Sequence, residues 1–298
     1  TPLENWRGFT NNVVHHVPYM PGSFLYTIPF FGLTQILGVP YDQRMVYMIL
    51  FLVSFPLISL ICPAGYGRRL AFAVFGLNPF FVRYFQLGAN DIMIWFLLLL
   101  TLVFFNKNMK TAGFTALAAA CAVKQFAWFF VPFLTINQLN LSGLKLTEFP
   151  VKIWQKRKNW IPGAVLFLVT VLPFLIWDPV SFYQDTFKYG SGGLPTSYPI
   201  QGFHGYGFGS VLLFLRFIPD GNVNFPFVII QALTVIPLFV KFYNKSRSGI
   251  DLAESILFSS IILLVFMFFS RYLHGNFVGF IAFWPVLSFC MFRKEAKS

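Results

Sequence analysis

The chain of 298 residues is 57% hydrophobic and 20% aromatic, and only 11% of its residues are charged. In soluble domains about a quarter of the residues are charged. This composition therefore excludes a water-soluble enzyme, a disordered tail and a disulfide scaffold. Roughly 170 apolar residues suffice for about eight or nine membrane spans of ~20 residues each. The sequence therefore predicts an all-α, polytopic transmembrane helical bundle of about 8–10 membrane segments, some of them broken or re-entrant.

The charge balance is strongly basic, with 22 Lys and Arg against 10 Asp and Glu, a formal net charge of +12. The basic residues cluster in short loops between apolar runs, where they indicate topology and contact with anionic lipid headgroups. We therefore expect membrane lipids as partners and no nucleic acid. Cys62, Cys121 and Cys290 lie inside apolar runs without CxxC spacing, which favours small core residues.

Taken in chain order, residues 1–43 are polar and rich in proline, which predicts an outer-face loop with short interfacial helices. Residues 44–298 form the predicted transmembrane domain. Its spans are expected at 45–62, 70–86, 92–105, 112–124, 160–177, 225–242, 252–269 and 277–292. Residues 125–136 are too short for an independent span and fit the return limb of a broken helix. The polar stretch 178–209 is a long outer loop, and such loops are usually functional.

The positive-inside rule gives this arrangement an orientation. All strongly basic segments fall on one side of the predicted spans, and they are 68–69, 107–110, 145–158, 241–247 and 293–297. The opposite, non-cytoplasmic side then holds most of the acidic residues and histidines. The chain starts at Thr1 without a signal peptide, so we expect a transmembrane helix upstream. The predicted location is integral and multi-pass, in a bacterial or archaeal plasma membrane or in the endoplasmic reticulum.

Lys124 is the sharpest candidate for chemistry, because it interrupts a long apolar run. A cation at that depth costs a few kcal/mol on insertion scales and is usually paired or functional. One interpretation makes Lys124 a phosphate ligand at the outer end of a broken helix. The other makes it a snorkelling lysine at a helix end.

Two further polar groups lie near predicted span ends on the same side. Asp91 follows a tight turn and opens a span, so it is either an N-cap or a ligand for a sugar hydroxyl or a metal. The segment 270–276, SRYLHGN, carries Arg271 and His274, which can clamp a phosphate through charge-assisted hydrogen bonds. A plain polar turn at the headgroup level has the same composition.

The outer loops supply the remaining candidates. Asp185, Tyr189 and His204 in the long loop suit carbohydrate contacts or an interfacial aromatic belt. Glu4 is the only acidic residue before Asp42, which makes it a general base by elimination. Adjacent histidines at 15 and 16 seldom converge on a metal, so no metal site is predicted. No nucleotide, zinc-protease or serine-hydrolase motif occurs and no cofactor is predicted, but the sequence leaves a divalent metal open.

Three segments together resemble a known family. Residues 78–134 carry an Asn-Pro, a short Gly-to-Asp turn opening a helix, an Ala-Gly helix start and then Lys124. Residues 17–29, VPYMPGSFLYTIP, are similar to a Tyr-Pro-Pro segment, and residues 270–287 are similar to a late turn bearing Arg and His. In these features the chain resembles the GT-C superfamily of polytopic glycosyltransferases that use polyprenyl-phosphate sugars.

The resemblance implies an inverting hexosyltransferase on the non-cytoplasmic face. The donor would be a polyprenyl-phosphate sugar of the mannose or glucose class, and the acceptor a lipid, a glycan or a protein. By resemblance, Lys124 would hold the donor phosphate with Arg271 and His274, and Asp91 would line the sugar pocket. The catalytic carboxylate would be the general base, either Glu4 or a residue upstream of Thr1.

A transporter or flippase of lipid-linked sugars or small anions is the alternative from another class, because broken helices and an intramembrane lysine suit transport too. The absence of a convincing internal repeat and the long outer loop favour the enzyme. A structural membrane partner ranks last, since it leaves Lys124 without a role.

Overall fold

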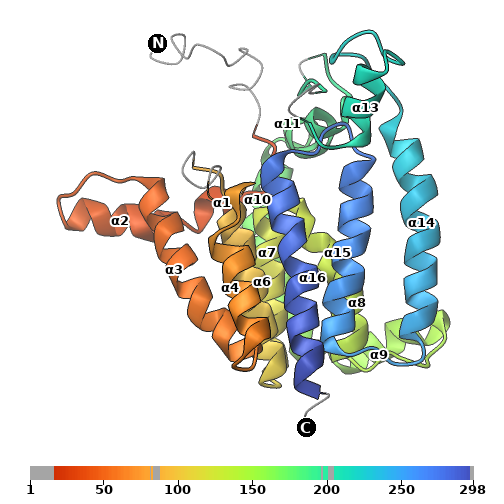
Figure 1. The fold of residues 1–298 in the computed structure, drawn as a ribbon. Helices are drawn as coiled ribbons and strands as arrows, with labels where there is room; N and C mark the ends of the chain where they lie inside the picture. Colours follow the sequence, from red (N-terminus) through yellow and green to blue (C-terminus); the bar gives the residue numbers. More distant parts are fainter. Residues whose placement is uncertain (1–16, 81, 83–87, 196, 201–204, 296–298) are drawn as a thin grey trace.

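The computed structural model describes residues 17–80, 82, 88–195, 197–200 and 205–295. Helices make up 74% of the structure, and no strand occurs among the described residues. The structure therefore agrees with the predicted all-helical class. Most of the long helices run side by side along one common direction (Figure 1).

Four helices are long and apolar enough to cross a membrane, and these are α3 (Gln43–Ile61), α10 (Arg157–Trp177), α14 (Phe227–Ser246) and residues Gly275–Phe292 of α16 (Gly275–Glu295). Three shorter apolar helices accompany them, α6 (Asp91–Asn106), α7 (Lys110–Val123) and α15 (Leu252–Phe268). The membrane-protein class is thus supported by four candidate spans. The larger number of 8–10 segments stays a prediction.

Two short helices, α1 (Gly22–Leu25) and α2 (Ile28–Ile36), precede α3, and α2 projects sideways from the upper end of the bundle (Figure 1). The helix α4 (Tyr66–Gly76) begins earlier than the span predicted at 70–86. It ends before Asn78, whose side chain accepts a hydrogen bond from the backbone N–H of Phe80 at 3.1 Å. Pro79 cannot continue the hydrogen-bond ladder of the helix, so the predicted Asn-Pro break is observed.

The chain turns back at Lys124. The helix α7 ends at Val123, and a 3-10 helix, η3 (Gln125–Phe130), leads into α8 (Val131–Gln138). The Lys110 ammonium at the start of α7 donates to the carbonyl of Gln138 at 2.7 Å, so the two limbs end side by side. The larger rise of a 3-10 helix, ~2.0 Å per residue, makes the short limb ~24 Å long, close to the ~21 Å of α7.

Two predicted loops contain helices. The stretch expected as a polar loop at 137–159 holds η4 (Leu146–Glu148) and α9 (Phe149–Gln155). The outer loop 178–209 contains α11 (Pro179–Tyr183), a π-helix (Gln184–Lys188) and α12 (Tyr189–Ser191), and it leads into α13 (Phe208–Phe214). These helices are three to seven residues long and lack a strong apolar period, so periodicity alone missed them.

Close helix contacts hold the bundle together, because in a lipid environment packing replaces the hydrophobic effect. A Cβ added at Gly163 of α10 would lie 2.6 Å from the carbonyl oxygen of Phe114 on α7. On the other side of the bundle, Trp95 of α6 packs between Phe75 of α4 and Phe283 of α16, with ring centroids 5.0 and 5.5 Å away. The two contacts fix α6 and α7 between α10 and α16. The candidate site lies at the start of α6 and the end of α7.

Candidate functional site

Lys124 occupies the break between α7 and η3. Its backbone is extended, with φ −159° and ψ 145°, which directs the side chain away from the α7 helix axis. The residue is only 4% exposed. The interpretation of Lys124 as a lysine that snorkels to the surface is therefore wrong for this structure, and a charge at this depth needs a partner inside the protein.

Asp91 is the charge partner of Lys124. The Lys124 ammonium lies 2.5 Å from Oδ1 of Asp91, and the Asn276 amide donates to Oδ2 at 2.6 Å. Asp91 is 2% exposed and is the first residue of α6, and its side chain caps no backbone N–H in the described structure. The N-cap interpretation is therefore wrong, although the carboxylate still lies at the positive end of the helix dipole.

Aromatic rings enclose the Lys124 ammonium. The centroids of Tyr19, Phe126 and Phe277 each lie 4.9 Å from its nitrogen. Ring faces attract a cation, and the attraction grows when water is excluded. One N–H of the ammonium is committed to Asp91, so two remain for a further acceptor.

A cavity of about 1010 Å³ adjoins this group, and both Lys124 and Asn276 are part of its wall. Tyrosine side chains gather at its upper end, and they are Tyr19, Tyr183, Tyr189, Tyr198 and Tyr272. Farther down, the lining is almost wholly apolar and comes from α14, α15 and η3, with Val235, Phe239, Ile262, Phe266 and Phe129. Along α14 the lining extends from Phe227 to Phe239, about 18 Å of helix. The cavity therefore suits a ligand with a polar head and an apolar tail.

Arg271 also lines the cavity, but most of its hydrogen-bonding capacity is already used. Its Nε donates to the carbonyl of Tyr198 at 2.7 Å, and its Nη1 and Nη2 donate to Val223 and Gly221 at 2.7 and 2.8 Å. The side chain is 2% exposed, and burial lowers the pKa of its guanidinium. Arg271 thus joins the turn between α15 and α16 to the outer loop at Tyr198 and to the segment before α14 at Gly221 and Val223. Only two of its five N–H groups are left for a phosphate.

His274 faces the same cavity from the turn before α16. Burial, together with the positive charge of Lys124, lowers its pKa to about 4. The imidazole is therefore neutral near pH 7 and offers a ligand a hydrogen bond without a charge. Rings of Tyr198, Tyr272 and Phe277 pack around it, with centroids 5.0–5.6 Å away.

The outer-loop candidates fall into two groups. Tyr189 lines the cavity, and burial raises its pKa to about 12, so it stays a neutral hydroxyl. Asp185 accepts a hydrogen bond from the backbone N–H of Val17 at 3.5 Å, and it does not appear among the lining residues of the described structure. Glu4 and His204 lie outside the described residues.

The site contains contributions that were not predicted. Asn276 was noticed only as part of a polar turn, and Tyr19 and Gln125 were not singled out as site residues. Gln125 donates to the carbonyls of Thr186 and Pro18, at 2.9 and 3.5 Å, and so joins the return limb to two outer segments. Gln125 stands directly beside Lys124 in an apolar run, and that adjacency was the available indication.

No group of three or more His, Cys, Asp or Glu side chains that could hold a metal ion occurs among the described residues. Comparison with protein-family models, with curated proteins and with solved structures returned no significant match for the chain.

Proposed function

We propose that the chain is a membrane glycosyltransferase that moves a hexose of the mannose or glucose class from a polyprenyl-phosphate donor. The acceptor is a lipid, a glycan or a protein on the non-cytoplasmic face. One observation carries the proposal. The buried Lys124 cation stands in the wall of a cavity that is polar and aromatic at one end and, apart from Gln231, apolar along ~18 Å of α14 at the other. A polyprenyl-phosphate sugar has the same order of polarity along its length, from a polar sugar through a charged phosphate to an apolar isoprenoid tail.

In this scheme Lys124 binds the donor phosphate with its two uncommitted N–H groups. When the bond between the anomeric carbon and the phosphate oxygen breaks, its electron pair stays on the phosphate, which gains negative charge. A fixed cation stabilises that charge more in the transition state than in the ground state. Asp91 and Asn276 keep the ammonium in place, so Asp91 serves as a positioning residue rather than as a base.

The acceptor side of the reaction needs a general base that deprotonates the attacking hydroxyl. Inversion requires that hydroxyl to approach the anomeric carbon opposite the phosphate. Glu4 is the candidate for this base, and His274 and Tyr189 donate hydrogen bonds to the sugar or the phosphate. Aromatic faces at the upper end of the cavity suit the apolar face of a hexose.

Transport of a lipid-linked sugar or a small anion is the second candidate, and the break between α7 and η3 at Lys124 favours it. Half-helices that end at a binding site near the membrane midplane are typical of secondary transporters. An enzyme transfers the sugar to an acceptor, whereas a flippase moves the intact lipid across the bilayer.

The first test is native mass spectrometry of the purified chain with polyprenyl phosphate and with a polyprenyl-phosphate hexose. We expect both lipids to be retained by the wild type and at least tenfold less by Lys124→Met. The control Lys241→Gln removes a positive charge from the exposed part of α14 at the other end of the bundle, and its binding should match the wild type. Equal retention by wild type and Lys124→Met would overturn the phosphate site.

The second test separates the two functions. The protein is reconstituted in vesicles with a donor that carries a radiolabelled hexose, together with a membrane extract as the source of acceptors. Label moving from the donor to a new product in the wild type, and not in Lys124→Met, supports the glycosyltransferase. Movement of the intact labelled donor between leaflets, without loss of its hexose, supports the flippase.

A further inference from the structure

A second cavity of about 840 Å³ opens between α6, α7 and α10, and it shares no lining residue with the first. Its apolar walls come from Leu97, Leu100 and Phe104 on α6 and from Leu166 on α10. Small side chains of α7 form its floor, and they are Ala112, Ala116 and Ala119. We refer to this cavity as the α7 groove.

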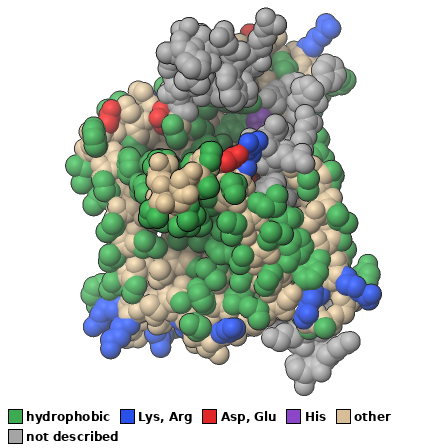
Figure 2. Space-filling model, turned by 90° about the vertical axis from the view of Figure 1, so that its left-hand side faces the viewer, with side chains coloured by type: hydrophobic (Ala, Val, Ile, Leu, Met, Phe, Trp, Pro, Cys, Tyr) green, Lys and Arg blue, Asp and Glu red, His purple; other side chains and the backbone are tan. Residues whose placement is uncertain are grey.

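Polar residues form one end of the α7 groove. Lys110 and Thr111 come from the start of α7, Asn108 from the turn before it, and Asn159 from the first turn of α10. The Thr111 hydroxyl donates to the carbonyl of Lys158 at 3.5 Å, which brings the starts of the two helices together. Lys and Arg side chains gather along this lower end of the molecule (Figure 2).

The electrostatics of this end are unbalanced. Helix starts are partially positive and are usually accompanied by acidic side chains. The first turns of α7 and α10 contain no acidic residue and no side-chain cap, and instead they carry Lys110, Arg157 and Lys158. An anion at the polar end of the groove would balance this accumulated positive charge.

The length of the groove argues for one kind of occupant. From Lys110 to Ala119 the lining extends over ten residues of helix, a rise of ~14 Å, which is close to the ~15 Å of one leaflet of the hydrocarbon core. A partner transmembrane helix needs a groove along the whole ~30 Å of that core. An acyl chain with its phosphate at the basic end needs one leaflet.

We propose that the α7 groove binds an anionic phospholipid of the leaflet at the basic end, with an acyl chain against Ala112 and Ala116 and its phosphate at Lys110. Basic pockets between transmembrane helices on the cytoplasmic side commonly bind anionic headgroups. The Lys110 ammonium donates one hydrogen bond to Gln138 and keeps two N–H groups for the phosphate. This site is independent of the proposed glycosyl transfer.

The test measures lipid retention by native mass spectrometry after exchange into detergent with phosphatidylglycerol or with phosphatidylcholine. Lys110→Gln keeps a donor for the Gln138 carbonyl but removes the charge, and we expect about fivefold weaker retention of phosphatidylglycerol. Ala112→Leu fills the floor of the groove, and we expect a loss of similar size while the polar end stays intact.

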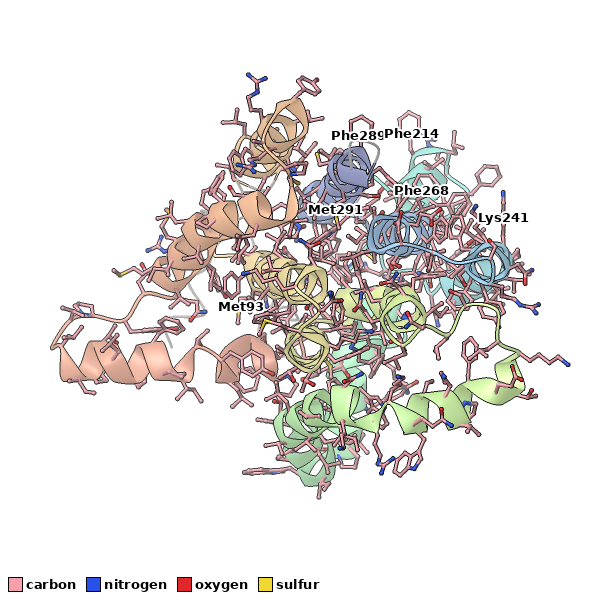
Figure 3. All side chains as sticks on the ribbon, turned by 90° about the horizontal axis from the view of Figure 1, so that it is seen from below. Met93, Phe214, Lys241, Phe268, Phe289 and Met291 are labelled. Carbon is pink, nitrogen blue, oxygen red and sulfur yellow. The ribbon has the colours of Figure 1, made fainter. Side chains whose placement is uncertain are left out.

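Matched controls come from α14, which lies at the other side of the bundle. Lys241→Gln removes a charge at the same end of the molecule, and Lys241 stands at the outer edge of the view from below, apart from α6 and α7 (Figure 3). Ala232→Leu enlarges a half-buried side chain on that helix. Both controls should retain phosphatidylglycerol as the wild type does.

Two results would overturn the site. Equal retention of the two lipids by the wild type would show that no anion is recognised. Full competition by glycerol phosphate, which has no acyl chain, would show a headgroup site without a role for the groove. Loss of phosphatidylglycerol in both test variants, with neither control affected, supports the site.

Discussion

The Lys124 ammonium lies 2.5 Å from the Asp91 carboxylate although 33 positions separate the two residues in the chain. Both side chains are nearly inaccessible, at 5% and 3% exposure. Breaking a buried pair is costly because one charge is left without compensation. The pair is therefore a structural element as well as the cationic wall of the cavity.

The first prediction concerns the stability of this pair. Asp91→Asn leaves the ammonium unpaired, and we expect the free energy of unfolding to fall by about 3–5 kcal/mol, with a similar loss in Lys124→Met. The double variant removes both charges and should recover more than half of the loss. Unfolding in detergent measures the free energy of unfolding of the two single variants and of the double variant. The control is Asp42→Asn, which changes an exposed ion pair with Arg44. Losses that simply add would mean that the charges do not interact.

The second prediction concerns Asn276, whose amide donates to Oδ2 of Asp91. A hydrogen bond to a charged group contributes about 1.5–3 kcal/mol, so Asn276→Leu should destabilise the protein by that amount. If Asn276 acts by positioning Asp91, the same substitution should cost much less once Asp91→Asn and Lys124→Met are both present. An undiminished loss in that background would assign Asn276 to packing alone. The same unfolding assay decides between the positioning role and the packing role of Asn276.

The third prediction concerns the clamp that Arg271 forms on the outer loop at Tyr198 and on the segment before α14 at Gly221 and Val223. Gly192 has a φ of +88°, and a Cβ there would lie 2.5 Å from Nη1 of Arg271. Gly192→Ala should therefore displace the guanidinium and speed hydrogen exchange of peptides from 205–223, as Arg271→Met should. In Gly193→Ala the new Cβ meets side-chain atoms of Lys188 no closer than 3.5 Å, so exchange should match the wild type. Unchanged exchange in Gly192→Ala and Arg271→Met would show that the loop does not depend on the clamp.

The fourth prediction concerns pH. The folded protein holds the pKa of His274 at about 4, well below its ordinary value of 6.5. Between these two values the unfolded chain binds a proton that the folded chain does not, so stability falls as the pH drops from about 6.5 towards 4. Above pH 6.5 the imidazole is neutral in both states and this destabilisation is absent.

We expect His274→Gln to show a smaller decrease of the melting temperature between pH 7 and pH 5 than the wild type. The comparison is made within one detergent and at constant ionic strength, so that the other histidines contribute equally to both proteins. Parallel pH profiles for the two proteins would show that His274 does not titrate in this range.

The sequence predicted much of the helical arrangement. The spans expected at 252–269 and 160–177 correspond closely to α15 and α10, because long apolar runs bounded by polar residues are strong local patterns. The short helix α9 was missed because its seven residues carry only weak periodicity. The break at Lys124 was expected from a charge in an apolar run, and the structure places it between α7 and η3.

The sequence by itself determined the membrane-protein composition, the concentration of basic residues in a few loops and the isolation of Lys124 among apolar residues. Only the tertiary structure decided that Lys124 pairs with Asp91, that Asn276 joins them from a position 185 residues away, and that Arg271 binds backbone carbonyls. The physical reason is that helix formation depends on neighbouring residues. The partner of a buried charge depends on which helices pack together, and that contact has no periodic trace in the sequence.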